Sequence, residues 1–328
     1  MRKVEISCAF APSMDTPDHV VLAEQLGYRR AWLYDSPALY PDVWMALARA
    51  ADRTTTIGLG PAVLVPSLRH PMVNAAAIAG LAAQAPGRVS VAVGSGFTGR
   101  MGFGQRPMKW SDVGTYMRVL MGLLRGEDVE WEGKTLRMLQ LPGFGAERPV
   151  DVPFLIAASG PKGMALAEEL GAGVFSAAVP TACDVDWHAF LCFGTVIDEG
   201  EEPTSARVKA AAGPGLVVTL HATYESSGAG VDGFPGGAKW REAVERTPPN
   251  ARHLAIHEAH LVALNDRDRL AIDDLAPLVT SIGISGTAKE VRDKMKGLED
   301  AGVTEIAYQP SGPDIPRELR AFMDAAAG

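Results

Sequence analysis

Cysteines, long apolar runs and secretion signals are scarce or missing in this sequence of 328 residues. The three cysteines, Cys8, Cys183 and Cys192, are not paired at metal-binding spacings, and an odd number fits a reducing compartment. No stretch approaches the roughly 18 consecutive apolar residues of a membrane span. The amino-terminal run MRKVEISCAF is broken by Glu5 and shows no signal-peptide cleavage pattern. We therefore expect a cytoplasmic protein with no membrane partner.

An excess of positive charge is missing too, and the net charge of −8 argues against nucleic acid as a partner. The sequence has no G-x-S-x-G elbow and no cysteine in a nucleophile context, so covalent hydrolysis is unsupported. Apolar residues make up 47% of the chain and charged residues 21%, which permits a sizeable core. The length fits one large α/β barrel or two ordinary domains.

Eight short apolar runs alternate with longer helical patterns along the chain. These runs cover residues 3–10, 29–35, 56–65, 87–96, 153–159, 173–179, 188–197 and 304–310. Continuous apolar runs of this kind are typical of parallel strands that are buried on both faces. The pattern predicts a single (β/α)₈ TIM barrel over residues 1–328, with a doubly wound open sheet as the alternative.

Residues from about 216 to 274 do not fit one strand-and-helix unit. Helical patterns such as KWREAVERT and RHLAIHEAHLVAL flank the glycine-rich run SSGAGVDGFPGG. We expect a helical insertion before the last strand, which would form a lid over the open face of the barrel.

A glycine-rich loop, GSGFTG at Gly94–Gly99, follows the fourth strand directly. A dinucleotide fold would need a helix to open here, and the following RMGFGQRP predicts none before Ser111. A merely flexible loop is one interpretation. Because Arg100, Arg106 and Lys109 follow closely, the loop is also a candidate anion cradle at the face where barrel active sites lie.

A second candidate cradle is AASGPKGMALAEE, in which Ser159 and Gly160 precede Pro161 and Lys162. Small residues before a helix amino terminus suit a phosphate group, although an ordinary helix cap is equally consistent with the pattern.

Three side chains are candidates for acid or base chemistry. Asp35 ends the second strand, where it would either cap a turn or reach a reacting centre. In HEAH, His257 and His260 are three residues apart, which predicts one helix face. They form either a structural pair or part of the lid over a substrate. Since no third ligand accompanies them, no metal site is expected.

Three stretches together resemble the bacterial luciferase-like (β/α)₈ flavoproteins: GPAVLVPSLRHP, GRVSVAVGSGFTGR and GISGTAKEVRDKMKGLEDAGVTEIAYQPSG. Within that superfamily the chain is most similar to the coenzyme F-420-dependent branch that includes methylenetetrahydromethanopterin reductase. The resemblance implies a non-prolyl cis peptide at Ala62–Val63, behind the ring of the cofactor. That bond would explain why an apolar strand runs into two prolines.

The resemblance also implies the residues that would bind the cofactor. They are Asp35, Ala62, Val63, Ser95, Gly96, Phe97, Arg100, Ala158, Ser159, Gly160 and Ser176, and Lys162 joins them from the second cradle. Some relatives that oxidise sugar phosphates have a histidine directly after the aspartate, whereas this chain has Ser36. Histidine-based alcohol oxidation is therefore not expected.

The expected activity is hydride transfer between reduced F-420 and a small C=C or C=N acceptor, with Asp35, His257 or His260 supplying a proton. The cations near both cradles favour F-420, whose phosphate carries a glutamate tail, over FMN. An FMN-dependent monooxygenase is the alternative, and a flavin-binding barrel without turnover is the non-enzymatic one. The resemblance further implies a homodimer formed through early helices such as PMVNAAAIAGLAAQA.

Overall fold

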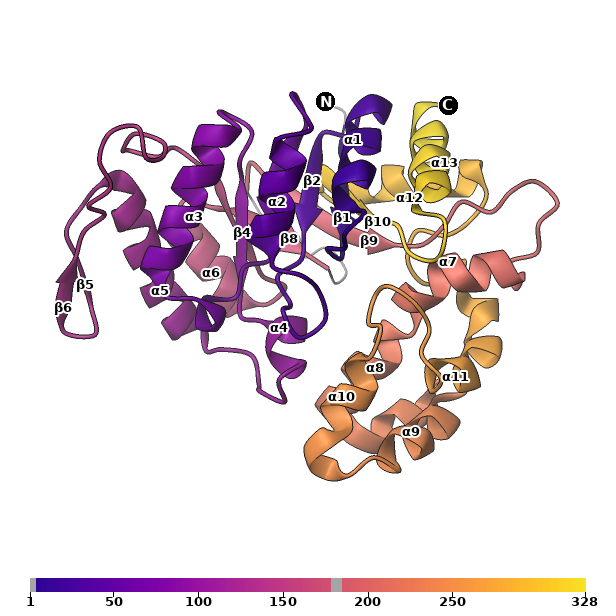
Figure 1. The fold of residues 1–328 in the computed structure, drawn as a ribbon. Coiled ribbons are helices and arrows are strands. Elements are labelled where there is room, and N and C mark those ends of the chain that lie inside the picture. Colours follow the sequence, from indigo (N-terminus) through magenta and orange to yellow (C-terminus); the bar gives the residue numbers. More distant parts are fainter. Residues whose placement is uncertain (1–3, 178–184) are drawn as a thin grey trace.

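A parallel sheet of eight strands forms the centre of the computed structural model, which describes residues 4–177 and 185–328 (Figure 1). Its strands are β1 Glu5–Phe10, β2 Arg30–Leu33, β3 Gly58–Pro61, β4 Val91–Gly94, β7 Phe154–Ala157, β8 Gly173–Ser176, β9 His188–Phe193 and β10 Glu305–Gln309. Each strand falls within one of the eight predicted runs, so the strand prediction is confirmed.

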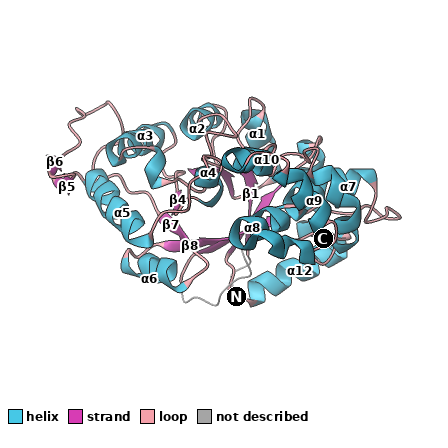
Figure 2. Cartoon of the chain, turned by 90° about the horizontal axis from the view of Figure 1, so that it is seen from below, coloured by secondary structure: helices cyan, strands magenta, loops and turns pink. Residues whose placement is uncertain are grey.

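The sheet closes on itself. Its strands follow the order β3-β2-β1-β10-β9-β8-β7-β4, and parallel bridges from Leu59 to Val89 and from Leu64 to Val93 join the two outer strands. Closure excludes the open doubly wound sheet and confirms the predicted TIM-barrel fold. Viewed from below, the strands lie at the centre and the helices surround them (Figure 2).

Helices that follow the strands cover the outside of the barrel. They are α1 Thr16–Leu26, α2 Val43–Ala51, α3 Pro71–Gln84, α5 Trp110–Arg125, α6 Pro161–Glu169, α12 Ala288–Asp300 and α13 Ile315–Ala327. Local sequence signals set their ends. Gly27 ends α1 in the left-handed conformation, at φ 86°, and Thr287 and Glu290 form a reciprocal capping box at the start of α12.

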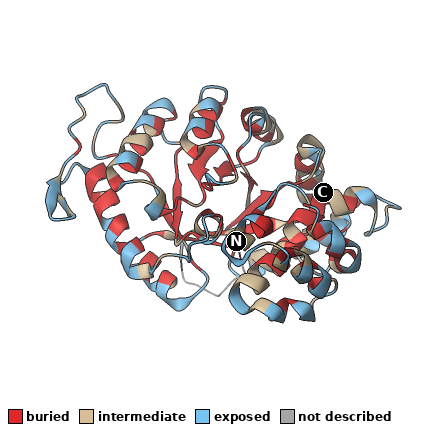
Figure 3. Ribbon diagram, turned by 60° about the horizontal axis from the view of Figure 1, so that its bottom comes forward, coloured by how far each residue is buried: buried red, intermediate tan, exposed pale blue. Residues whose placement is uncertain are grey.

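Two apolar layers make up the core because successive side chains of a strand point to opposite faces. Cys8, Phe10 and Tyr308 point outward against the helices. Trp32 and Leu155 fill the barrel interior together with small alanines. In Figure 3 the buried residues accordingly concentrate in the strands and on the helix faces turned toward them. Cys8 and Cys192 are buried free thiols, whereas Cys183 lies outside the described residues.

Before the last strand, a helical insertion gathers on one side of the barrel, the side on which α4 lies (Figure 1). It contains α7 Ala206–Leu216, α8 Val218–Ser227, α9 Gly237–Glu245, α10 Arg252–His257 and α11 Asp268–Leu275, with short 3-10 helices at Gly228–Gly233, Pro249–Ala251 and Ala276–Leu278. Since α4 directly follows β4, this is the carboxyl end of the strands. The insertion therefore precedes the last strand, as the sequence predicted, but its helices begin at Ala206, before the predicted start near residue 216.

Two sequence predictions near this end of the barrel are wrong. A short helix, α4 Phe97–Met101, begins inside the glycine motif, where no helix was expected before Ser111. Helix α10 ends at His257, so His260 is not on the same helix face but in a following turn. The chain leaves the helix there because Ala259 and Leu261 adopt positive φ angles of 56° and 63°.

One further element was not anticipated. Strands β5 Val129–Trp131 and β6 Lys134–Leu136 form an antiparallel hairpin that projects away from the barrel (Figure 1). Within residues 4–177 and 185–328, none of the helices combines the length and the apolar character required to cross a bilayer.

Candidate functional site

The carboxyl ends of the strands surround a pocket of about 430 Å³. Eight of the residues proposed from the sequence line it: Asp35, Ala62, Val63, Ser95, Gly96, Phe97, Ser159 and His260. Strand ends supply the barrel side of the pocket, and Val218 at the start of α8 supplies the insertion side. The pocket therefore lies between the barrel and the insertion.

Six of the proposed residues do not line this pocket: Arg100, Ala158, Gly160, Lys162, Ser176 and His257. The guanidinium of Arg100 donates to the Ser67 hydroxyl and to the Arg106 carbonyl, both at 2.6 Å. Gly160 and Lys162 are exposed at the start of α6, next to Ser159. Ala158 and Ser176 are buried, and the Ser176 hydroxyl is hydrogen bonded to the His188 ring at 2.8 Å.

The backbone behind the pocket has the unusual geometry that the family resemblance implied. The peptide bond between Ala62 and Val63 is cis, and both residues line the pocket. Leu64 then rejoins the sheet by pairing with Val93. The short 3-10 helix Pro66–Leu68 and the His70 cap of α3 follow, with the His70 ring accepting a hydrogen bond from the Met72 amide.

The glycine loop packs against that same segment. A Cβ atom at Gly94 would lie 2.9 Å from a methyl group of Val63, and one at Gly96 would lie 2.5 Å from a methyl group of Val65. Gly96 also has a φ of 88°, which favours glycine. Glycine at these two positions allows the loop to lie this close to the cis segment. The pocket wall that they form is therefore made largely of backbone atoms.

Asp35 is a buried charge at the edge of the pocket, and its partner is Arg69. Arg69 Nη1 donates to Asp35 Oδ2 at 2.6 Å, and Nη2 of the same guanidinium donates to Asp42 Oδ2 at 2.6 Å. Burial raises the pKa of Asp35 above its ordinary value, although the hydrogen bond and the positive charge of Arg69 oppose that rise. The cap of the next helix is Asp42, not Asp35.

Three histidines meet beside the pocket. His221 on α8, His257 at the end of α10 and His260 in the turn are each at most 2% exposed. One nitrogen from each ring lies within 4.8 Å of the others. Burial lowers the pKa of His260 well below its usual range, and the other two rings lower it further. Sequence reasoning missed His221, and its argument that no third ligand accompanies HEAH is wrong.

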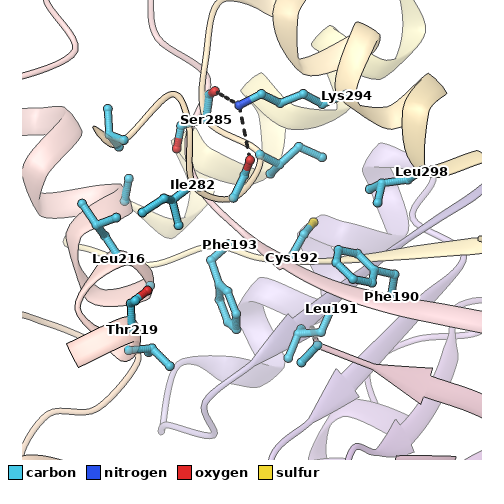
Figure 4. Close-up of a pocket in the computed structure, with 18 of the residues that line it drawn as sticks. Phe190, Leu191, Cys192, Phe193, Leu216, Thr219, Ile282, Ser285, Lys294 and Leu298 are labelled. Atoms are coloured by element: carbon cyan, nitrogen blue, oxygen red, sulfur yellow. Dashed lines mark hydrogen bonds between the residues drawn. The ribbon is translucent and has the colours of Figure 1, made fainter. Parts of the chain in front are cut away.

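A second pocket, of about 600 Å³, adjoins the first and shares four lining residues with it: Ala177, Leu191, Phe193 and Val218. Figure 4 shows β9, α12 and the chain around Ile282 and Ser285 on its sides. Its walls are mainly apolar. The ammonium group of Lys294 is engaged with the carbonyls of Thr280 and Ser285, at 2.6 and 2.7 Å. The pocket therefore suits an apolar group.

Comparison with known proteins places these features in a family context. A family model described as luciferase-like monooxygenase matches residues 11–189, more than half of the chain. The 5,10-methylenetetrahydromethanopterin reductase of Archaeoglobus fulgidus is 27% identical, and the match covers 95% of each chain. An F-420-dependent glucose-6-phosphate dehydrogenase of Beutenbergia cavernae is 35% identical over 50% of this chain and 52% of its own length.

The fold has close counterparts among solved structures. The coenzyme F-420-dependent tetrahydromethanopterin reductase of Methanopyrus kandleri superimposes with a TM-score of 0.67 at 18% identity, covering 99% of both chains. At this identity the likeness establishes the fold alone.

Proposed function

Because this chain belongs to the luciferase-like monooxygenase family, we propose that it is a coenzyme F-420-dependent oxidoreductase. It would transfer hydride between the reduced deazaflavin and a small organic acceptor with a C=C or C=N bond. The observation that carries the proposal is the pocket formed by the cis Ala62–Val63 segment and the glycine loop. The named activities of the relatives from Archaeoglobus and Beutenbergia support the same choice.

The pocket suits a flat ring that is held by backbone. Ala62 and Val63 would lie behind the ring, and Ser95, Gly96 and Phe97 would hold it from the side of the glycine loop. Ser159 and the exposed Gly160 and Lys162 beside it would hold the part that leaves the ring, whereas Ala158 and Ser176 are buried behind them and keep only the role that the family resemblance implied. When bound, F-420 supplies hydride exchange at its deazaflavin ring.

Positive charge near the pocket favours F-420 over FMN. Arg106 and Lys109 are exposed on the segment that follows α4, and Arg100 lies on α4 itself. One phosphate does not require three cations, whereas a phosphate with a glutamate chain has several carboxylates to pair with them. We assign Arg100 to the phosphate region and Arg106 and Lys109 to the tail.

Asp35 is the proposed proton carrier of the reaction. It lines the pocket, and burial raises the pKa of its carboxyl group against the opposing charge of Arg69, so it takes up a proton more readily than a solvated aspartate with the same partner would. His257 does not line this pocket, and its ring faces Glu225 at 3.6 Å. We therefore assign no proton transfer to His257.

The acceptor would bind under the insertion, next to the ring. The adjoining apolar pocket meets the cofactor pocket at Leu191, Phe193 and Val218, which favours an acceptor with an apolar body. A homodimer formed through helices such as α3 remains a prediction.

The second candidate is an FMN-dependent monooxygenase, which the description of the matching family favours. Titration of the purified apoprotein with F-420 and FMN, followed by fluorescence, separates the two. We expect micromolar or tighter binding of F-420 and FMN binding at least tenfold weaker, a difference of about 1.4 kcal/mol. Equal or reversed affinities would favour the monooxygenase. Tight F-420 binding without hydride exchange to any C=C or C=N compound would favour a binding protein.

The tail assignment has its own test. Arg106→Glu combined with Lys109→Glu should weaken F-420 binding severalfold, more at low ionic strength than at high, because salt screens exposed charges. Binding of a deazaflavin monophosphate without the tail should hardly change. If both ligands lose equal affinity, the cations serve the structure of the loop and not the tail.

A further inference from the structure

Hydrogen bonds within the cluster of three buried histidines beside the pocket leave one ring, that of His257, without a partner. His221 Nδ1 and His260 Nδ1 face each other at 3.0 Å. His257 packs against both rings, with ring centroids 6.3 Å from that of His221 and 5.1 Å from that of His260. Yet both ring nitrogens of His257 are buried without a hydrogen-bond partner. A buried polar group without a partner is unfavourable and calls for a physical explanation.

We propose that His221, His257 and His260 form a binding site for a divalent transition metal ion of the zinc class. Neutral imidazole nitrogens are ligands that suit Zn²⁺, and three histidines with one open position are an established zinc ligand set. Two nitrogens bound to one tetrahedral Zn²⁺ at about 2.0 Å lie roughly 3.3 Å apart. The separation of 3.0 Å between His221 and His260 is within a few tenths of an ångström of that value.

The polar groups near the outer nitrogens of the three rings also favour a metal site. Metal-bound histidines commonly use their second ring nitrogen to contact a carboxylate or another polar group, which fixes the orientation of the ring. Here His221 Nε2 lies 3.1 Å from Asp268 Oδ1, and His260 Nε2 lies 3.4 Å from the Thr98 hydroxyl. The Nε2 atom of His257 lies 3.6 Å from Glu225 Oε1. One nitrogen of each ring therefore has an outer polar neighbour while the three rings converge.

Asp268 itself is held firmly. The indole of Trp240 donates to its Oδ1 at 2.9 Å, and the backbone N–H of Asn265 donates to its Oδ2 at 3.2 Å. These bonds fix the carboxylate that faces His221. A metal at this point would connect α8, the end of α10 and the turn that carries His260 into the cofactor pocket. The ion would thus hold the insertion in place over the proposed cofactor site.

The experiment uses the full chain without an affinity tag, stripped of metal by a chelator and then dialysed. Equilibrium dialysis with Zn²⁺ should give one ion per chain, with a dissociation constant in the micromolar range or below. Co²⁺ in place of Zn²⁺ should give the intense visible absorption of a tetrahedral ion. His257→Ala should weaken Zn²⁺ binding at least tenfold, whereas His253→Ala on the same helix should leave it unchanged.

The thermal stability of the same variants keeps the proposal open to refutation. In chelator, His257→Ala should melt below the parent because removing the buried ring leaves a cavity, so the test is the shift that Zn²⁺ adds to each variant. Added Zn²⁺ should raise the melting temperature of the parent and of His253→Ala, but not that of His257→Ala. Absence of a stoichiometric ion, or equal Zn²⁺ binding by His257→Ala and the parent, would overturn the proposal. None of these measurements involves F-420, so the outcome does not depend on the proposed activity.

Discussion

Arg69 is the side chain whose removal should disturb the candidate site most directly, because it holds the buried carboxylate of Asp35. In Arg69→Met, the apolar stem is largely kept while the guanidinium is lost. The side chain of Asp35 is 1% exposed, so water cannot replace the missing partner. The side chain of Asp42, which Arg69 also contacts, is 39% exposed and can be hydrated.

The expected loss of stability follows from this difference in burial. Two unit charges at about 4 Å attract by roughly 4 kcal/mol at an effective dielectric constant near 20. Breaking a buried pair by removing one partner typically costs about 3–5 kcal/mol, whereas an exposed pair contributes about 1 kcal/mol or less. We therefore expect Arg69→Met to lower the free energy of unfolding by about 3 kcal/mol near neutral pH. Asp42→Asn, which can still cap α2, should lower it by less than about 1 kcal/mol.

The pH dependence of the free energy of unfolding tests the same buried carboxyl group. Burial raises the pKa of folded Asp35 above its unfolded value, so the folded state binds the proton more tightly, and stability falls as the pH rises through the interval between the two pKa values. Without Arg69 the pKa should rise further, so the fall should be steeper and should extend to higher pH. The double variant Arg69→Met, Asp35→Asn has no carboxylate to titrate and should lose that slope.

Urea unfolding between pH 5 and pH 8 measures the free energy of unfolding of each variant and its change with pH. The double variant should be about 2 kcal/mol more stable than Arg69→Met at pH 8 and should differ less at pH 5. If Arg69→Met does not fold, Arg69→Lys offers the same test with a retained charge and a smaller expected loss. A loss that is the same at every pH, or a double variant no more stable than the single one, would refute the reasoning about Asp35.

Other predictions concern the pocket and the far end of the barrel. Gly99→Ala should weaken F-420 binding at least tenfold, because its Cβ would lie 2.9 Å from the Asp35 carbonyl oxygen. Gly80→Ala in α3 meets nothing within 4 Å and should leave binding unchanged while adding about 0.5–1 kcal/mol of stability. Asp35→Asn should lower kcat by about 100-fold or more in steady-state assays, with little change in the dissociation constant of F-420 measured by fluorescence. Glu305→Gln, which leaves buried Arg30 without its charge partner, should cost about 3 kcal/mol in urea unfolding and leave kcat per folded molecule unaltered.

The strands could be predicted from the sequence because burial on both faces leaves an unbroken apolar run. The positions of Asp35 and the glycine loop at the ends of those strands followed from the same pattern. The hairpin β5–β6 had a usable signal in its two-residue turn, where Glu132 and Gly133 have φ angles of 51° and 72°, but the flanking strands are too short and too polar to stand out.

The histidine cluster could not be predicted, since its members come together only through the packing of the insertion. His221 lies on a different helix from His257 and is far from it in sequence. The turn that brings His260 inward depends on positive φ angles at Ala259 and Leu261, which their side chains do not favour. The helical pattern of the sequence therefore continues past His257, where the folded chain ends the helix. The partnership of Arg69 with Asp35 was likewise invisible, because it joins the end of β2 to the irregular segment that precedes α3.

The segment from Gly60 to Pro71 shows why a core strand ends in two prolines, an arginine and a histidine. Its cis peptide lines the pocket, and Val65 provides the surface on which the glycine loop rests at Gly96 and Gly99. Arg69 then turns back to neutralise Asp35 at the edge of the same pocket. A regular strand continued into a regular helix would satisfy its backbone more simply, but it would place none of these groups at the pocket. The Gly60–Pro71 segment therefore brings part of the pocket wall, the contact surface of the glycine loop and the partner of Asp35 to one edge of the pocket.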